Sequence, residues 1–168
     1  VEGGTEEQKG VLYTGLHHLL MHPNILQDVN GEYPMMENDK IGKTDHNRYT
    51  VFSLWDTYRC THQLITLLYP DRQEDMLRSM MGIYREFGWL PRWELCGRET
   101  RTMEGDPALP VIVDSYLKGL CPYDAEEVYQ AMRKHAFTPG KDNPLRPDND
   151  DYMQRTYVPL RSKHDNSV

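Results

Sequence analysis

The chain has 168 residues, a formal net charge of −7 and 38% hydrophobic residues. This length and balance predict one globular domain with a hydrophobic core rather than a disordered chain. The acidic charge argues against nucleic acid and anionic membranes as main partners, and no apolar run approaches membrane-spanning length.

Helix starts are marked clearly along the chain. Thr5 with Gln8, and Ser53 with Asp56, have the spacing of capping boxes that begin helices. Asp106 before Pro107, and Asp124 with Glu127, are predicted to cap two later helices. Pro70 is expected to end the helix that begins at Ser53, and Gly88 suits the position that follows a helix end. Apolar residues then recur at helical spacing, and glycine or proline follows most of these runs. These signals predict five helices, over about Glu6–Met21, Leu54–Tyr69, Arg72–Phe87, Pro107–Lys118 and Ala125–His135.

The remaining segments are expected to form a hairpin and long loops. The Asn30-Gly31 pair is a strong turn signal and predicts a hairpin between Leu26–Val29 and Glu32–Met35. Glycines and prolines mark the segment from Phe137 onward as irregular. No strand–helix alternation indicates a parallel sheet. The predicted fold class is therefore all-α, a helical toroid or part of one, with one small β-hairpin insertion.

The stretch Gly88–Asp106 lies between two predicted helices and is expected to form no regular element. It holds two tryptophans, three arginines, three glutamates and one aspartate, and loops of this length inside a compact domain are often functional. A sugar-binding cleft needs an aromatic ring that stacks on the pyranose and charged groups that bind its hydroxyls. The alternative is a solvated charged rim, although Trp89 and Trp93 would be costly to expose.

The Trp55-Asp56 pair has two interpretations. In the first, Asp56 only caps a helix and Trp55 belongs to the core. In the second, both lie at the mouth of a ligand cleft, with Arg59 one turn further on and close enough to pair with Asp56. No HExxH, GxSxG, GxGxxG, P-loop or Asp-rich calcium-loop motif occurs in the sequence.

Several separate runs of the sequence, in the same order, resemble glycoside hydrolase family 92. They are VEGGTEEQK at the start, FSLWDTYRCTHQLITLLYP, GWLPRWELCGRET followed by Met103, and VIVDSYLKGL. The resemblance extends from Val1 to about Val168. Members of this family are exo-acting, calcium-dependent α-mannosidases, so the resemblance implies a mannose-containing glycan as the ligand.

The resemblance also implies an organisation larger than this chain. Family members combine an N-terminal β-sandwich with a catalytic (α/α)6 toroid of twelve helices. Residues 1–168 would be a fragment of that single toroid, without the β-sandwich and the later helices. The catalytic acid and base, and most calcium ligands, belong to later family motifs, so we expect no catalytic or metal-binding residue here. Export to the periplasm or outside the cell is implied by the resemblance alone.

Substrate positioning is the role that the matched motifs imply for this chain. We expect Asp56 to bind mannose hydroxyls and a tryptophan to stack on the sugar ring. Asp106 stands where we expect histidine in many members, which leaves the linkage preference open. The implied substrate-binding residues are Trp55, Asp56, Trp93, Glu94, Glu99 and Met103.

The intact protein is therefore expected to be an inverting α-mannosidase that releases non-reducing mannose, with the isolated chain inactive. The start at Val1 and the polar end over Arg161–Val168 predict a processed or partial product. Exposed helix faces are then expected to be covered by the rest of the polypeptide or by self-association. A non-catalytic glycan-binding or helical scaffold fragment is the alternative, and a glucoamylase-like hydrolase is a weaker one.

Overall fold

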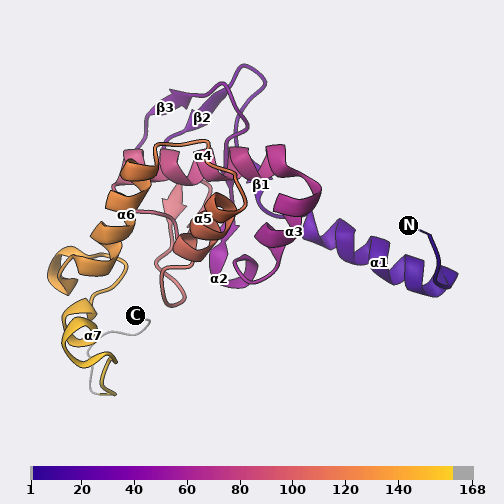
Figure 1. The fold of residues 1–168 in the computed structure, drawn as a ribbon. Helices are drawn as coiled ribbons and strands as arrows, with labels where there is room; N and C mark the ends of the chain where they lie inside the picture. Colours follow the sequence, from indigo (N-terminus) through magenta and orange to yellow (C-terminus); the bar gives the residue numbers. More distant parts are fainter. Residues whose placement is uncertain (1, 161–168) are drawn as a thin grey trace.

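The computed structural model describes residues 2–160, and the predicted irregular end Arg161–Val168 lies outside them. About half of the chain is helical (Figure 1). One turn of 3-10 helix, η1 (Gly140–Asp142), precedes the last helix. The α-helices are α1 (Glu6–Leu19), α2 (Leu54–Thr57), α3 (Thr61–Leu68), α4 (Pro70–Phe87), α5 (Ala108–Leu117), α6 (Ala125–Phe137) and α7 (Asn149–Arg155).

Three small antiparallel sheets accompany the helices of the described residues. Strands β1 (Asn24–Ile25) and β4 (Tyr49–Thr50) form the first, and β2 (Glu32–Pro34) and β3 (Ile41–Lys43) form the second. The third has the order β5 (Phe52–Ser53), β6 (Trp93–Leu95) and β7 (Arg98–Glu99). The predicted helical character is therefore confirmed, but among the described residues three small sheets replace the single hairpin insertion expected in an all-α class, and the partial toroid stays a prediction.

Local helix signals are confirmed where the cap and the helix belong to one segment. Thr5 and Gln8 form the predicted capping box at α1. Asp124 accepts a hydrogen bond from the backbone N–H of Glu126 and so caps α6. Gly88 ends α4 in the left-handed conformation, at φ 86°, which favours glycine.

The helix predicted over Leu54–Tyr69 is broken into α2 and α3. Ser53 donates to the carboxylate of Asp56 instead of capping the backbone, so the predicted box does not form. The chain leaves the helical conformation at Cys60, at φ −139°, and the side chain of Gln63 binds the carbonyl of Tyr58. Pro70, which was expected to end this helix, is the first residue of α4, a position that proline suits.

The hairpin predicted at Asn30-Gly31 is also wrong in its pairing. The turn itself exists, because Gly31 has φ 83° and donates its N–H to the carbonyl of Asp28. One backbone hydrogen bond crosses the turn, from the N–H of Asp28 to the carbonyl of Glu32, but the ladder of β2 is formed with β3. The backbone N–H of Leu26 instead bonds to the carbonyl of Arg48. A distant strand therefore outcompetes the neighbouring one.

Two segments predicted as irregular contain regular structure. Strands β6 and β7 lie within Gly88–Asp106, where a tight turn with Gly97 at φ 83° joins them. η1 and α7 follow Phe137. The β6–β7 hairpin is itself local, because the two residues Cys96 and Gly97, at φ 49° and 83°, form its turn.

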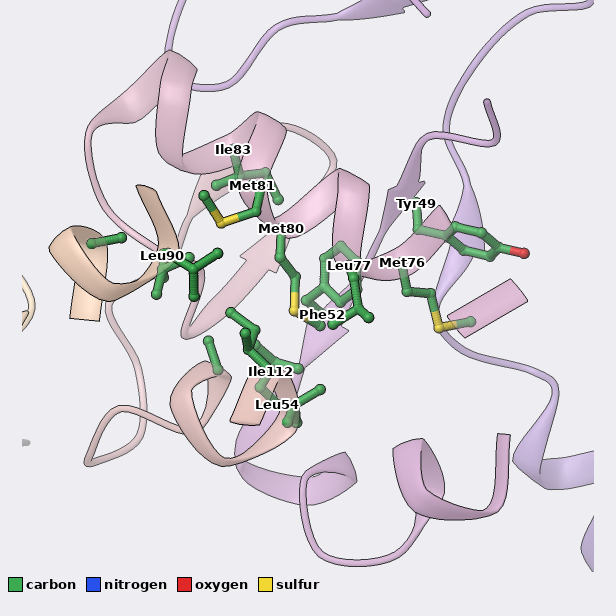
Figure 2. Close-up of a cluster of buried hydrophobic side chains, with 14 of the residues drawn as sticks. Tyr49, Phe52, Leu54, Met76, Leu77, Met80, Met81, Ile83, Leu90 and Ile112 are labelled. Atoms are coloured by element: carbon green, nitrogen blue, oxygen red, sulfur yellow. The ribbon is translucent and has the colours of Figure 1, made fainter. Parts of the chain in front are cut away.

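The hydrophobic core is built around α4. Its buried residues include Met76, Leu77, Met80 and Ile83, which face apolar side chains from α3, α5 and the strands. Figure 2 shows this cluster, with Phe52 of β5 and Ile112 of α5 among its members. The core thus fixes the position of β5, which leads directly into α2.

By contrast, α1 has no buried residue and extends away from the other elements (Figure 1). Its apolar residues Val11, Leu12 and Tyr13 are exposed, Val11 by 71%. A helix that exposes apolar side chains in this way is typical of an interface. No helix among the described residues has the length and apolar character required to cross a membrane.

A buried ion pair lies against the opposite face of α4. Arg48 donates to Glu86 over 3.0 Å, and both side chains are almost fully buried. Glu86 also accepts hydrogen bonds from the hydroxyl of Tyr33 and the N–H of Met36. The guanidinium of Arg48 passes over Gly82, where a Cβ atom would overlap with Nη1. Glycine within this helix therefore makes room for the ion pair.

Gly82→Ala should destabilise the protein although alanine is the better helix former. The helix gains about 1 kcal/mol from the change, whereas displacing Arg48 from buried Glu86 costs about 3 kcal/mol. A net loss of about 2 kcal/mol is expected in urea unfolding. Gly15→Ala in α1 is the control, because open space surrounds Gly15 and no loss is expected. A stabilised Gly82→Ala protein would contradict this account of Gly82.

Candidate functional site

Strand pairing brings the Trp55-Asp56 segment next to the 88–106 segment. In the register of β5 and β6, Ser53 lies opposite Trp93. The indole Nε1–H of Trp93 donates to Ser53 Oγ, which in turn donates to Asp56 Oδ2 over 2.5 Å. We call this chain of three residues the Ser53 bridge. It fixes an aromatic ring and a carboxylate relative to each other.

The two outer members of the Ser53 bridge remain accessible. Asp56 is exposed and Trp93 is half-buried. A hollow of about 220 Å³ is lined by Trp93 and Ser53 together with His22, Val51, Glu94, Leu95 and Thr100. An aromatic side beside a solvent-facing carboxylate is the combination that binds sugars, because the ring covers apolar C–H groups and the carboxylate accepts hydroxyl hydrogens.

Trp55 lies elsewhere. The guanidinium of Arg59 stacks on its ring, 4.7 Å from the ring centre. Trp55 lines a second, more open hollow of about 310 Å³, shared with Tyr58 and Asp106. One face of Trp55 is thus already covered by a cation. Arg59, which was expected to pair with Asp56, contacts the aromatic ring of Trp55 instead.

Glu94 is buried, although it also contributes to the lining of the hollow beside Trp93. Its Oε1 accepts hydrogen bonds from Thr50 Oγ1 and from the N–H of Gly97, at 2.8 and 2.6 Å. Its Oε2 is buried without a partner among the described residues. Burial raises the pKa of the Glu94 carboxyl, and the two hydrogen bonds oppose that rise only in part.

Glu99 is buried as well and binds backbone groups. Its carboxylate accepts the N–H groups of Arg92, Trp93 and Arg101, at 2.9 to 3.1 Å. It also faces Glu94 across the β6–β7 pair. These contacts hold the backbone that carries Trp93. Glu94 and Glu99 therefore support the strand beside the Ser53 bridge.

Met103 is half-buried, and its backbone carbonyl makes the contact described here. Its carbonyl accepts a hydrogen bond from Arg92 Nη1 over 2.9 Å. Met103 has φ 64°, and Val51, Cys96 and Arg101 also have positive φ. For a β-branched residue such as Val51 this conformation is strained. Such residues gather at binding sites more often than elsewhere, and these four flank the Ser53 bridge in sequence.

Asp106 was expected to cap the following helix, and this expectation is wrong. Its carboxylate binds Arg146 Nη1 and His135 Nδ1, at 3.0 and 3.1 Å. His135 Nε2 accepts the N–H of Leu90, so Nδ1 carries the proton in the neutral ring. Both neighbours of Asp106 lower the pKa of its carboxyl against the effect of burial. This cluster ties the two ends of the 88–106 segment to α6.

The predicted site residues thus separate into groups. Asp56 and Trp93 share the Ser53 bridge, Trp55 faces another hollow, and Glu94 and Glu99 are buried behind the strand. Ser53 was considered only as a helix cap, and no sequence signal shows its pairing with Trp93. Within residues 2–160, no three His, Cys, Asp or Glu side chains gather into a metal-binding group.

Comparison with known proteins gives one consistent result. The family model described as the glycosyl hydrolase family 92 catalytic domain matches residues 1–168. A family GH92 α-mannosidase from Bacteroides thetaiotaomicron is similar at TM-score 0.86 and 32% identity, covering 95% of this chain and 21% of that chain. Its complex with mannoimidazole is similar at TM-score 0.82 and 33% identity, covering 91% and 20%.

A family GH92 inverting mannosidase from Bacteroides thetaiotaomicron VPI-5482 is similar at TM-score 0.84 and 30% identity. The similarity covers 95% of this chain and 22% of that chain. The chain therefore spans about a fifth of the length of these solved relatives. No curated protein matches the chain.

Glu94→Gln should stabilise the protein, increasingly as the pH rises. The carboxyl has a pKa above its ordinary value of 4.5, so its ionisation favours the unfolded state. As far as Glu94 is concerned, the free energy of unfolding of the wild type has its full value below pH 4.5. It decreases as the pH rises through the raised pKa of the folded protein. Glutamine keeps the oxygen that accepts from Thr50 and Gly97 and carries no charge.

Urea unfolding of wild type and Glu94→Gln between pH 4 and 8 measures this effect. The stability of the variant relative to wild type should increase with pH and then level off. Glu32→Gln, in the exposed strand β2, controls for the loss of one negative charge. A difference that is constant or decreases with pH would refute the buried-carboxyl interpretation.

Proposed function

Because the chain belongs to glycosyl hydrolase family 92, we propose that the intact protein is an α-mannosidase that releases non-reducing mannose from glycans. The observation that carries the proposal is the Ser53 bridge. It joins an exposed carboxylate, Asp56, to a half-buried tryptophan, Trp93, that lines a hollow together with Ser53. The similar α-mannosidase solved with mannoimidazole supports a mannose-like ligand.

In this proposal the residues of the chain position the sugar. Trp93 stacks against the apolar face of mannose, and Asp56 accepts hydrogen bonds from its hydroxyls. Ser53 keeps both side chains in place. Glu94, Glu99 and Met103 support the strand and loop that carry Trp93, while Trp55 lines the neighbouring hollow.

Hydrolysis with inversion needs one carboxylic acid and one carboxylate about 6.5–9.5 Å apart, with space for water between them. Glu94 and Glu99 do not suit these roles, because they are buried and bound to backbone N–H groups. We therefore assign the acid and the base to other parts of the intact protein. The calcium requirement, export from the cytoplasm and the (α/α)6 toroid belong to the same proposal.

The exposed apolar face of α1 supports the presence of further protein around this chain. Val11, Leu12 and Tyr13 would be covered in the intact protein by the rest of the polypeptide or by a second copy. The relatives, of which this chain spans about a fifth, have ample additional chain for this purpose. Residues 1–168 are then one part of a catalytic domain.

Substitutions in the Ser53 bridge should impair mannoside hydrolysis while the fold persists. Asp56→Asn in the intact protein should lower kcat/KM roughly tenfold to a hundredfold, since a hydrogen bond to a charged group contributes about 1.5–3 kcal/mol. Ser53→Ala should have a smaller effect in the same direction. Asp114→Asn on the surface of α5, where Asp114 pairs only with Lys118, is the matched control.

Steady-state kinetics on an aryl α-mannoside and unfolding curves measure these effects. If Asp56 only served the helix start, Asp56→Asn would lose stability but keep wild-type kinetics. That outcome would remove Asp56 from the site.

Activity should require the intact protein and calcium. The intact protein should hydrolyse α-mannosides and lose that activity with a chelator, whereas residues 1–168 alone should hydrolyse none. Release of mannose can be followed by chromatography with and without added Ca²⁺. Mannose binding without hydrolysis by the intact protein would favour the non-catalytic alternative, and indifference to chelation would remove calcium from the proposal.

A further inference from the structure

A separate and larger cleft of about 660 Å³ lies along α4. Its walls are the β2–β3 hairpin with the residues that follow it, α4, and the turn between α5 and α6. It shares no lining residue with the hollow beside the Ser53 bridge or with the hollow at Trp55. In Figure 1 α4 separates the hairpin from α2. The cleft is thus remote from the proposed mannose site.

The charge of this cleft differs from that of the chain as a whole. The charged side chains on its walls are those of two acidic residues, Asp45 and Glu86, and four basic ones, Lys43, Arg48, Arg78 and Arg85. The cleft therefore has an excess of two positive charges on a chain of net charge −7. A concave surface lined by one sign of charge concentrates ligands of the opposite sign.

Two of the four cations are already neutralised. Arg48 pairs with buried Glu86 at 3.0 Å. Arg85 forms a bidentate ion pair with Glu127, through Nε at 2.8 Å and Nη2 at 2.5 Å. These pairs leave Lys43, Arg78 and Asp45 as the remaining charged groups of the cleft, an excess of one positive charge. The carboxylate of Asp45 contacts His46 Nδ1 over 3.2 Å.

The other two cations, Lys43 and Arg78, form no ion pair within residues 2–160. Both are exposed, one on β3 and the other on α4, at opposite walls of the cleft. His46 lies between them in sequence and lines the same cleft, and its Nε2 is buried without a partner among these residues. The uncommitted donors of the cleft are therefore cationic or imidazole nitrogens.

We propose that this cleft binds a small organic anion through Lys43 and Arg78. The volume suits a molecule of the size of a sugar phosphate or a tricarboxylate. The common chemistry is an oxyanion: Arg78 can bind two of its oxygens side by side, and Lys43 supplies a second charge. The buried Arg48–Glu86 pair and Gly82 form the floor, which is fixed before the ligand enters.

Calorimetric titration of the intact protein at low ionic strength tests this proposal. The probes are glucose 6-phosphate, citrate and inorganic phosphate, with glucose as the uncharged match for glucose 6-phosphate. The two organic anions should bind, glucose should not, and binding should weaken as NaCl is raised. Stronger binding of glucose 6-phosphate than of citrate would identify a phosphate ligand, and the reverse would identify a carboxylate.

The variant Lys43→Ala/Arg78→Ala should weaken binding of the organic anions at least tenfold. Lys40→Ala/Arg72→Ala is the matched control: Lys40 and Arg72 are exposed cations in or beside the same hairpin and helix but do not line the cleft. Its affinity should stay within twofold of wild type. Arg78→Lys should retain part of the affinity, because lysine keeps the positive charge but lacks the planar guanidinium that binds two oxygens at once.

Three results would overturn the proposal. One is the absence of binding by every anion, and another is equal affinity in Lys43→Ala/Arg78→Ala and wild type. The third is a loss of thermal stability in that variant without ligand, beyond the loss in Lys40→Ala/Arg72→Ala. Such a loss would mean that Lys43 and Arg78 already pair with acidic side chains elsewhere in the intact protein, which then fill the cleft in place of a ligand. None of these readouts depends on mannosidase activity.

Discussion

The pairing of β5 with β6 is the contact on which the proposed sugar site depends. It is very short, with only Phe52 opposite Glu94 and Ser53 opposite Trp93. Strands of two residues are not stable by themselves, so other contacts must hold them together. The burial of Phe52 and Leu54 in the core anchors one strand. Polar side chains anchor the other.

Those polar anchors are the glutamates that the sequence had pointed to as sugar ligands. Glu94 connects the β6–β7 turn to Thr50, and Glu99 gathers three backbone N–H groups around Trp93. A third carboxylate, Glu37, accepts the N–H of Glu99, while its own N–H binds the carbonyl of Gly97. Buried backbone groups need partners, and in an irregular segment carboxylates supply them. The two glutamates of this loop thus hold its backbone and are not part of a solvated rim, while their role as sugar ligands stays a prediction.

The sequence predicted what is local and missed what is not. The capping box at Thr5, the cap at Asp124 and the left-handed Gly88 each involve neighbours along the chain, and all three are confirmed. The Asn30-Gly31 turn also exists, but its strand pairs with β3 instead. The partner strand β3 begins only seven residues after β2 ends, and both strands are mostly exposed, so burial does not decide this pairing. Local spacing carries no information about it.

The same distinction applies to the candidate site. The family motifs singled out Asp56 and Trp93, 37 positions apart in the sequence, and the structure brings them together through Ser53. The S-x-x-D spacing at Ser53 was correctly seen as a close contact, but the hydroxyl binds the Asp56 carboxylate and not the backbone. The sequence does not distinguish a helix cap from a binding-site contact here, because the distinction depends on a third residue, Trp93. Trp93 lies on a different strand, β6.

Helix α4 joins the two functional proposals into one physical picture. One face of it packs into the apolar core that positions β5, and the other carries the Arg48–Glu86 pair. Between α4 and its helical neighbours, buried Gln73 binds His62 of α3 and Ser115 of α5. Burial lowers the pKa of His62 to about 4, so the ring stays neutral at neutral pH and the network can remain within the core. Because each such polar group is held by a specific partner, α4 cannot rotate or slide without leaving one unpaired. That constraint keeps both clefts in fixed positions on either side of a single helix.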